Sequence, residues 1–492
     1  MTDAVIAPDL ADRSRLFIDG QWHDTEGGKI IDVLNPVDQS VVGRSAVGTS
    51  ADVDRAVGAA KASFEDRRWR DLPGPERAAV MRRAADILES RLDEIAVLLT
   101  SELGCPLWFS QQAHVPNPIR HTRYYADLAE SYELDDVRTD ANGMRSIVTQ
   151  EPVGVAAAIT PWNGPLSTPS IKIAPAIAAG CSVVLKPPTQ TPLSAFAFAD
   201  AFAEAGLPEG VLNIVPADRE AAQSLIEHPH VDKLAFTGST AVGQTLMRAA
   251  ANRVARVTLE LGGKSAAVVL PDADAETVAK AVLPMALVVN GQLCIAQSRI
   301  LVPRNRETEF TEAFAEALRA WTVGHPMDPA TKIGPLVSKN QLDTVQGYIS
   351  LARDEGARIV SGAETLVLPP ELENGWFVPP TLLAGVDNSM RAVREEIFGP
   401  VLALVPYDDV EEAIDIANDS PYGLSGSVWG ADVDDAVRVA RRIRTGMVSI
   451  NGFPQAYGSP FGGYKMSGIG REMGPEGFRS YLETKSIAIG PA

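Results

Sequence analysis

The strongest constraint on the fold is a regular alternation of short apolar runs with helical segments between residues 153 and 263. None of the five runs alternates polar with apolar residues, which is typical of strands covered on both faces. Strands separated by helices predict an α/β fold with a parallel sheet, whose ligands bind beyond the carboxyl ends of the strands. The runs lie at 153–160, 182–187, 211–216, 233–238 and 257–263, with helices at about 166–179, 192–205, 218–227 and 240–251.

A second series of apolar runs follows the first along the chain. These runs are also separated by segments of helical character, so they predict a second α/β domain with its own sheet. The five runs lie at 266–270, 299–303, 358–362, 424–430 and 446–452.

Two segments before the first sheet carry local signals of their own. From Pro75 to Leu103 the apolar residues recur at helical spacing, and Gly104 is placed to end the helix. One amphipathic helix is therefore expected.

Within 133–152, an Asn-Gly pair at 142–143 separates two extended, mostly polar runs. Asn-Gly is the strongest short hairpin signal, so this segment predicts a protruding hairpin.

Composition narrows the class of protein. The chain of 492 residues is long enough for two or three domains, at about 100–200 residues each. Its 63 acidic and 44 basic side chains give a net charge of −19, which argues against a nucleic-acid surface. No apolar stretch is long enough to span a membrane, and the acidic N-terminal segment does not resemble a signal peptide. Three cysteines, an odd number, favour a reducing compartment, so we expect a soluble, cytoplasmic protein.

Cys294 is a candidate nucleophile because it follows a polar, glycine-containing break at 290–292. A cysteine on such a turn can be exposed, with its thiolate stabilised by backbone N–H groups. The alternative is a small buried hydrophobic residue, and Cys105 and Cys181 are interpreted in that way. The cysteines form no CxxC motif and the six histidines form no metal-binding motif, so no metal is expected.

Glu260 and Asn163 both occur where an apolar strand ends. A carboxylate in this position is partly desolvated, which raises its pKa toward neutrality and suits it to general-base chemistry. An ion pair with a nearby lysine is the alternative for Glu260. Asn163 offers an amide N–H donor of the kind that an oxyanion site needs, although a turn-forming asparagine before Gly164 would also explain it.

Gly238, Ser239 and Thr240 join a predicted strand to a helix, where backbone N–H groups and hydroxyls can bind a phosphate. An ordinary capped turn is the alternative, because the sequence lacks the full GxGxxG pattern. Lys186 closes a buried strand, from which it could reach a cofactor phosphate or ribose or remain an exposed terminal charge. Residues 262–265 resemble the end of a P-loop, but Thr258 stands where the first glycine is required, so an ATPase is rejected.

Taken together and in order, these elements resemble the aldehyde dehydrogenase superfamily over nearly the whole chain. The separation of 34 residues between Glu260 and Cys294 also suits that family. The motifs that carry the resemblance are PWNGPL at 161–166, LKPPTQTP at 185–192, FTGSTAVG at 236–243, LELGGKS at 259–265, GQLC at 291–294, EEIFGPV at 395–401 and PFGGYKMSGIGRE at 460–472.

The resemblance implies an enzyme that oxidises an aldehyde with NAD or NADP. Cys294 would attack the aldehyde carbon, Asn163 and the Cys294 N–H would hold the oxyanion, and Glu260 would activate the water that hydrolyses the thioester. Lys186 and Glu396 would contact the riboses of the cofactor. The full set assigned to the cofactor is Thr160, Pro161, Trp162, Lys186, Thr189, Gly238, Ser239, Gly243, Leu261, Glu396 and Phe398.

It also implies a domain organisation and an oligomer. The Rossmann-like cofactor-binding domain would comprise 1–130 and 150–261, and the catalytic domain 262–465. The segments 131–149 and 466–492 would form an oligomerisation element and C-terminal arm, so a homodimer or homotetramer is expected.

Two positions depart from the commonest family pattern. Thr189 replaces a glutamate that binds the adenosine ribose in many NAD-preferring members. A carboxylate repels a 2′-phosphate and a threonine does not, so NADP remains open, although NAD is still favoured. Gly164 replaces a frequent aromatic residue, which would widen the substrate tunnel for a bulky, hydrophobic aldehyde, aromatic or terpenoid, unless neighbouring side chains fill the gap. The residues assigned to the substrate pocket are Gly164, Leu293, Ile295, Phe453, Tyr457 and Phe461.

Three other functions stay open. A CoA-acylating relative would pass the acyl group to CoA, although the presence of Glu260 favours water. A cysteine hydrolase would use Cys294 without a cofactor, but no partner histidine is evident. A non-catalytic binding protein of the same family is the third alternative.

Overall fold

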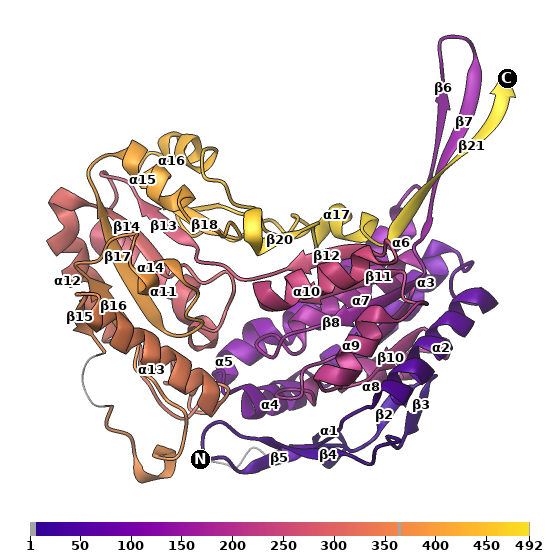
Figure 1. The fold of residues 1–492 in the computed structure, drawn as a ribbon, viewed down its shortest axis with the longest axis horizontal. Helices are drawn as coiled ribbons and strands as arrows, with labels where there is room; N and C mark the ends of the chain where they lie inside the picture. Colours follow the sequence, from indigo (N-terminus) through magenta and orange to yellow (C-terminus); the bar gives the residue numbers. More distant parts are fainter. Residues whose placement is uncertain (1–5, 363–365, 492) are drawn as a thin grey trace.

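The computed structural model describes residues 6–362 and 366–491. Residues 1–5, 363–365 and 492, which belong to the three predicted units, lie outside the described residues. The chain forms two large sheets, each covered by helices, and a three-stranded arm that projects from the body and carries the C-terminal strand (Figure 1).

The first large sheet confirms the predicted parallel core. Five parallel strands lie in the order β12-β11-β8-β9-β10, and their residues are mostly buried. Antiparallel strands that the sequence did not indicate extend both edges, β20 (Gly468–Ile469) at one edge and β2 (Leu16–Ile18) with β3 (Gln21–His23) at the other. The parallel strands are β8 (Val155–Ile159), β9 (Ser182–Lys186), β10 (Leu212–Ile214), β11 (Lys233–Thr237) and β12 (Arg256–Glu260).

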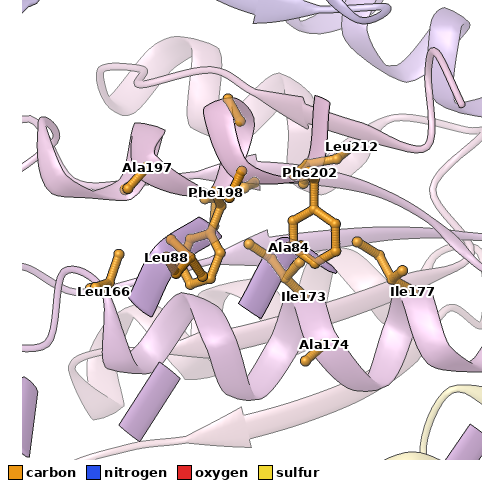
Figure 2. Packing of buried hydrophobic residues seen from close by; sticks show 14 of the residues in the cluster. Ala84, Leu88, Leu166, Ile173, Ala174, Ile177, Ala197, Phe198, Phe202 and Leu212 are labelled. Carbon is orange, nitrogen blue, oxygen red and sulfur yellow. The ribbon is translucent and has the colours of Figure 1, made fainter. Parts of the chain in front are cut away.

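Helices cover both faces of this sheet, as its apolar strands require. On one face, Leu88, Ile173 and Phe198 from three different helices meet in a common core (Figure 2). A second core on the other face contains Leu225 and Leu246. The first face is covered by α3 (Gly74–Ser90), α4 (Leu92–Leu103), α6 (Pro116–Ser131), α7 (Ser167–Ala179) and α8 (Ala197–Glu204), and the second by α2 (Ser50–Asp66), α9 (Arg219–Glu227) and α10 (Thr240–Ala251).

The prediction of one continuous helix from Pro75 to Leu103 was wrong. The chain leaves helical geometry at Arg91 (φ −108°, ψ 16°), so α3 and α4 are separate helices. The Ser90 hydroxyl donates to the Ile87 carbonyl at 2.7 Å, a local bond that competes with the helical pattern. The predicted end was correct, because Gly104 follows α4 in the left-handed conformation.

The second large sheet contains the five predicted strands and two more. Its order is β15-β16-β17-β14-β13-β18-β19, and β15 alone pairs antiparallel. The missed strands are β16 (Thr381–Ala384), which is short and follows two prolines, and β17 (Val401–Tyr407), which contains Pro406. The others are β13 (Ala266–Val269), β14 (Arg299–Pro303), β15 (Arg358–Ser361), β18 (Gly426–Trp429) and β19 (Ser449–Ile450), with helices α11 (Ala275–Leu287), α12 (Glu307–Leu318), α13 (Lys339–Asp354), α14 (Arg391–Arg394), α15 (Val410–Asn418) and α16 (Val433–Ala440).

The arm confirms the predicted hairpin. β6 (Asp135–Thr139) and β7 (Met144–Pro152) are joined by a turn in which the Asp140 carboxylate accepts from the Asn142 and Met144 N–H groups. β21 (Leu482–Pro491) pairs antiparallel with β7 along its length (Figure 1). The remaining strands and α-helices are α1 (Pro8–Ala11), β1 (Asp12–Arg13), β4 (Ile30–Leu34), β5 (Val41–Ala46), α5 (Leu107–Phe109) and α17 (Gly474–Arg479). The short helical turns are the π-helical η1 (Ser110–His114) and the 3-10 turns η2 (Ser194–Phe196), η3 (Val288–Gly291), η4 (Arg304–Arg306), η5 (Pro370–Leu372) and η6 (Lys465–Ser467). None of the helices within the described ranges is long and apolar enough to cross a membrane.

Candidate active site

A pocket of about 280 Å³ lies at the carboxyl ends of β8, β11 and β12. The second sheet contributes the segments that precede β14 and β17, together with α13, so the pocket lies between the two sheets. Nine of the residues assigned from sequence line it together: Pro161, Trp162, Asn163, Gly238, Ser239, Leu261, Cys294, Glu396 and Phe398.

Cys294 lies on a turn at the pocket wall, three residues after the short helical turn Val288–Gly291 that follows α11. Burial raises the pKa of its thiol to about 12, and the nearby carboxylates of Glu396 and Glu260 act in the same direction. The thiol is therefore protonated at neutral pH. A group that accepts its proton is needed before it can act as a nucleophile.

Asn163 lies on the loop after β8 and is 6% exposed. Its side-chain Nδ2 donates to the Gln292 carbonyl at 2.7 Å, so it directly contacts the loop that carries Cys294. The predicted amide donor and the predicted nucleophile therefore share one pocket, although they lie 131 residues apart in the sequence.

Glu260 ends β12 and is 1% exposed. Within the described residues, neither of its carboxylate oxygens has a hydrogen-bond partner. The ion pair with lysine that was its alternative interpretation is not formed, because buried Lys172 pairs with Glu472 instead. Burial and the charge of Glu472 raise the pKa of Glu260 well above its usual range, while Lys172 and Arg471 oppose the shift.

Glycines make room for carboxylates on both sides of the site. A Cβ on Gly462 would lie 2.6 Å from Glu260 Oε1, and one on Gly262 would lie 2.4 Å from Glu396 Oε2. The Glu396 carboxylate accepts from the Gly263 N–H at 3.0 Å, and its burial raises its pKa to about 7. Larger residues at these glycines would force the two carboxylates to move.

The rest of the pocket has an aromatic wall and a helix end. The rings of Trp162 and Phe398 meet edge to face at 5.3 Å. Ser239 caps α10, its hydroxyl accepting from the Val242 N–H at 3.4 Å. The backbone N–H groups of a helix's first turn are of the kind that bind an anion. The buried hydroxyls of Thr160 and Thr237 have no hydrogen-bond partner among the described residues. These unpaired donors suit a polar ligand.

The model of the aldehyde dehydrogenase family matches residues 22–487. The chain belongs to the aldehyde dehydrogenase family. It is 44% identical over 479 residues to geranial dehydrogenase of Castellaniella defragrans, covering 97% of this chain and 99% of that protein.

Solved structures of other family members share the fold. An aldehyde dehydrogenase of Mycobacterium tuberculosis complexed with NAD+ has a TM-score of 0.94 and 45% identity, covering 97% of this chain and 98% of that one. Aldehyde dehydrogenase C of Pseudomonas syringae, complexed with NAD+ and octanal, has a TM-score of 0.94 and 41% identity, covering 99% and 98%.

Several residues that the resemblance assigned to the cofactor lie outside the pocket of this family member. Lys186 ends β9, where burial lowers its pKa to about 8. Thr189 is half-buried on the following loop. Gly243 is buried, and a Cβ there would lie 2.5 Å from a methyl group of Leu261. Gly243 therefore sets how closely α10 packs on the end of β12.

The residues assigned to the substrate pocket separate into two groups. Leu293 and Ile295 are half-buried beside Cys294, and Phe461 is half-buried with its backbone paired to Glu472. Phe453 is 74% exposed and Tyr457 is 48% exposed. None of the six residues assigned to the substrate pocket lines the described pocket. The Tyr457 ring instead stacks on His121.

The space beside Gly164 is occupied. A Cβ at this position would lie 2.6 Å from Thr168 Oγ1 and 2.9 Å from Ser167 Oγ. Neighbouring side chains therefore fill at least the nearest part of the gap, as the alternative interpretation held. The missing ring by itself does not establish a wider tunnel.

Sequence reasoning missed part of the pocket wall. Gln341 and Thr344 line it from α13, and Gln341 Nε2 donates to the Phe398 carbonyl at 2.8 Å. Both are ordinary polar residues on a helical surface, so nothing in the sequence distinguished them. Across the described residues, no group of three or more His, Cys, Asp or Glu side chains is arranged to hold a metal ion.

Proposed function

We propose that this protein oxidises an aldehyde to the carboxylic acid, with NAD as the favoured hydride acceptor and NADP as the alternative. The observation that carries the proposal is the meeting of Cys294, Asn163 and Glu260 in and beside one pocket of an aldehyde dehydrogenase fold. CoA-acylating activity is less favoured because Glu260 is present as a base for water.

Cys294 is the nucleophile in this proposal. Its sulfur attacks the aldehyde carbon after its proton passes to a base, for which Glu260 is suited because its buried pKa is raised. The carbonyl oxygen becomes an oxyanion, which the Asn163 amide and the Cys294 N–H stabilise. The bond from Asn163 to the Gln292 carbonyl orients the side chain before substrate arrives.

The residues present fit a dinucleotide. The first turn of α10 would bind the pyrophosphate, Glu396 and Lys186 would bind ribose hydroxyls, and Phe398 would pack beside the nicotinamide ribose. The unpaired Thr160 and Thr237 hydroxyls support a polar ligand at these strand ends. When bound, the nicotinamide would supply the hydride acceptor for oxidation of the Cys294 adduct to a thioester.

Glu260 completes the reaction by activating water, after the proton that it took from the Cys294 thiol has passed to solvent. A carboxylate with a raised pKa accepts a proton from water more readily than an ordinary glutamate does, once it is ionised. The activated water attacks the thioester carbon, and the acid leaves as the Cys294 sulfur takes back a proton. The Lys172–Glu472 ion pair fixes the charge beside Glu260.

We infer that the substrate is a bulky, hydrophobic aldehyde, aromatic or terpenoid. Similarity to geranial dehydrogenase supports this class, as does the half-buried apolar pair Leu293 and Ile295 beside the nucleophile. The filled space beside Gly164 weakens the argument from the missing ring. A size series of aldehydes, from acetaldehyde to geranial and benzaldehyde, tests this inference through kcat/KM.

We also infer a homodimer or homotetramer in the cytoplasm, with the chain divided at the boundaries expected from sequence. The arm exposes Val137, Met144, Ile487 and Ile489, an apolar surface suited to a second copy. The three free cysteines suit a reducing compartment. Sedimentation of the purified protein measures the oligomeric state.

One experiment tests the activity. The protein is mixed with NAD or NADP and the aldehyde panel, with and without CoA, and nicotinamide reduction is followed by absorbance. We expect reduction without CoA and formation of the free acid. Product formation that depends on CoA would favour the acylating alternative, and no reduction with any aldehyde would favour a non-catalytic binding protein.

A further inference from the structure

We propose that Asn290 is a positioning residue that fixes Cys294 relative to Asn163. This inference rests on the proposed function of those two residues. Its basis is a buried side-chain amide that ties the loop before the nucleophile to two distant segments of the chain.

The loop that Asn290 holds has an unusual backbone. Val289 (φ 53°, ψ 33°), Asn290 (φ 58°, ψ 34°) and Gly291 (φ 72°) are three consecutive left-handed residues. Glycine adopts this conformation freely and asparagine tolerates it, but a β-branched valine does not. Such strain persists only where the surrounding structure enforces it, and it concentrates at functional sites.

Asn290 supplies the enforcing contacts. Its side chain is fully buried, and Nδ2 donates to the Pro335 carbonyl at 2.6 Å and to the Gly104 carbonyl at 3.3 Å. Oδ1 accepts from the Gly334 N–H at 2.8 Å. The partners follow α4 or precede α13, so the amide joins three segments that are far apart in sequence.

The contacts of Asn290 constrain Cys294 and Asn163 through the next two residues, Gly291 and Gln292. Gln292 is also fully buried, its Nε2 donating to the Val289 carbonyl at 3.1 Å and its Oε1 accepting from the Val337 N–H at 3.0 Å. Its own carbonyl accepts from Asn163. A loop held in this way points the Gln292 carbonyl at Asn163 and presents Cys294, two residues later, to the same pocket.

Asn213 provides a matched control for a purely structural role. It is also fully buried, and its Nδ2 donates to two carbonyls, those of Gly210 at 2.8 Å and Val183 at 3.3 Å. Its Oδ1 accepts from the Asp19 N–H at 2.9 Å. The bonding therefore duplicates that of Asn290, but in β10, between β9 and β2 of the first sheet, and outside the pocket.

The experiment compares Asn290→Ala with Asn213→Ala in the full-length protein. We expect similar decreases in thermal midpoint, because the two amides make equivalent bonds. Only Asn290→Ala is expected to lower kcat, by about 10- to 100-fold, with a much smaller change in KM for the aldehyde. The pH dependence of Cys294 alkylation by iodoacetamide in the cofactor-free protein is expected to change only in this variant.

A second variant, Asn290→Asp, complements the alanine substitution. Asn290→Asp keeps the acceptor for Gly334 N–H but loses both donated bonds, and it serves if the alanine variant does not fold. Parental kcat and alkylation in a folded Asn290 variant, or equal losses in Asn213→Ala, would refute the positioning role. Absence of aldehyde oxidation in the parent protein would refute the proposed function instead, while the alkylation comparison still tests the tether.

Discussion

The reactivity of Cys294 in the cofactor-free protein gives a sharp test of the site. Burial, Glu396 and Glu260 raise the pKa of the thiol to about 12, compared with an ordinary value of 9.0. At pH 8 the thiolate fraction is then about 10⁻⁴, roughly 10³-fold below that of an ordinary cysteine. Because the thiolate is the reactive species, the alkylation rate is expected to increase about tenfold for each pH unit between 7 and 10.

The assay is alkylation by iodoacetamide, followed by mass spectrometry of the peptide that contains Cys294. Cys105 and Cys181 are buried, and burial raises their pKa values to about 12 and about 11. The Cys294→Ala protein measures any contribution from these two thiols. A rate that reaches a plateau below pH 9 would show that Cys294 is already ionised and that the reasoning from burial is wrong.

Replacing Glu396 by a neutral residue tests how much its carboxylate contributes to the raised pKa of Cys294. Glu396→Gln removes a negative charge near the thiol, so it is expected to lower the Cys294 pKa and speed alkylation at pH 8. Glu395→Gln is the matched control, because the adjacent Glu395 pairs with Arg391 at the surface. Equal rates in the two variants would exclude Glu396 as a cause of the raised pKa.

Four other predictions concern catalysis and stability. Glu260→Gln is expected to accumulate acyl-enzyme on Cys294, detected by intact-protein mass spectrometry, and deacylation at the parental rate would identify another base. Asn163→Ala is expected to lower kcat by about 10²–10³-fold, which is the usual cost of losing one oxyanion donor. Cys294→Ala is expected to abolish turnover, and normal turnover by this variant would contradict the proposed nucleophile. Burial raises the pKa of Glu102 from 4.5 to about 7. Between these two pH values the folded protein binds more protons than the unfolded chain, so the free energy of unfolding falls as the pH rises from 4.5 to 7. Glu102→Gln is expected to reduce the decrease in unfolding free energy between pH 5 and 8 by about 3 kcal/mol, measured by denaturant unfolding. The control Glu204→Gln, at an exposed position, is expected to leave the decrease unchanged. Equal pH dependence in the two variants would contradict the assignment of the decrease to the buried carboxyl group.

Local patterns determined much of what could be predicted. The five apolar runs of the first sheet and the Asn-Gly hairpin were correct because burial and turn geometry leave signals within a few residues. The break at Arg91 was missed because helical spacing continues across it. β17 was missed because Pro406 makes a central strand resemble a loop.

The sequence by itself determined the α/β class, the family resemblance and the three side chains proposed to react. Only the tertiary structure decided that Gln341 forms part of the pocket wall, that Lys172 pairs with Glu472 rather than Glu260, and that Thr168 fills space beside Gly164. The physical reason is the range of the interactions. Strands, helices and turns follow from neighbours along the chain, whereas ion pairs, pocket walls and the Asn290 bonds depend on segments that folding alone brings together.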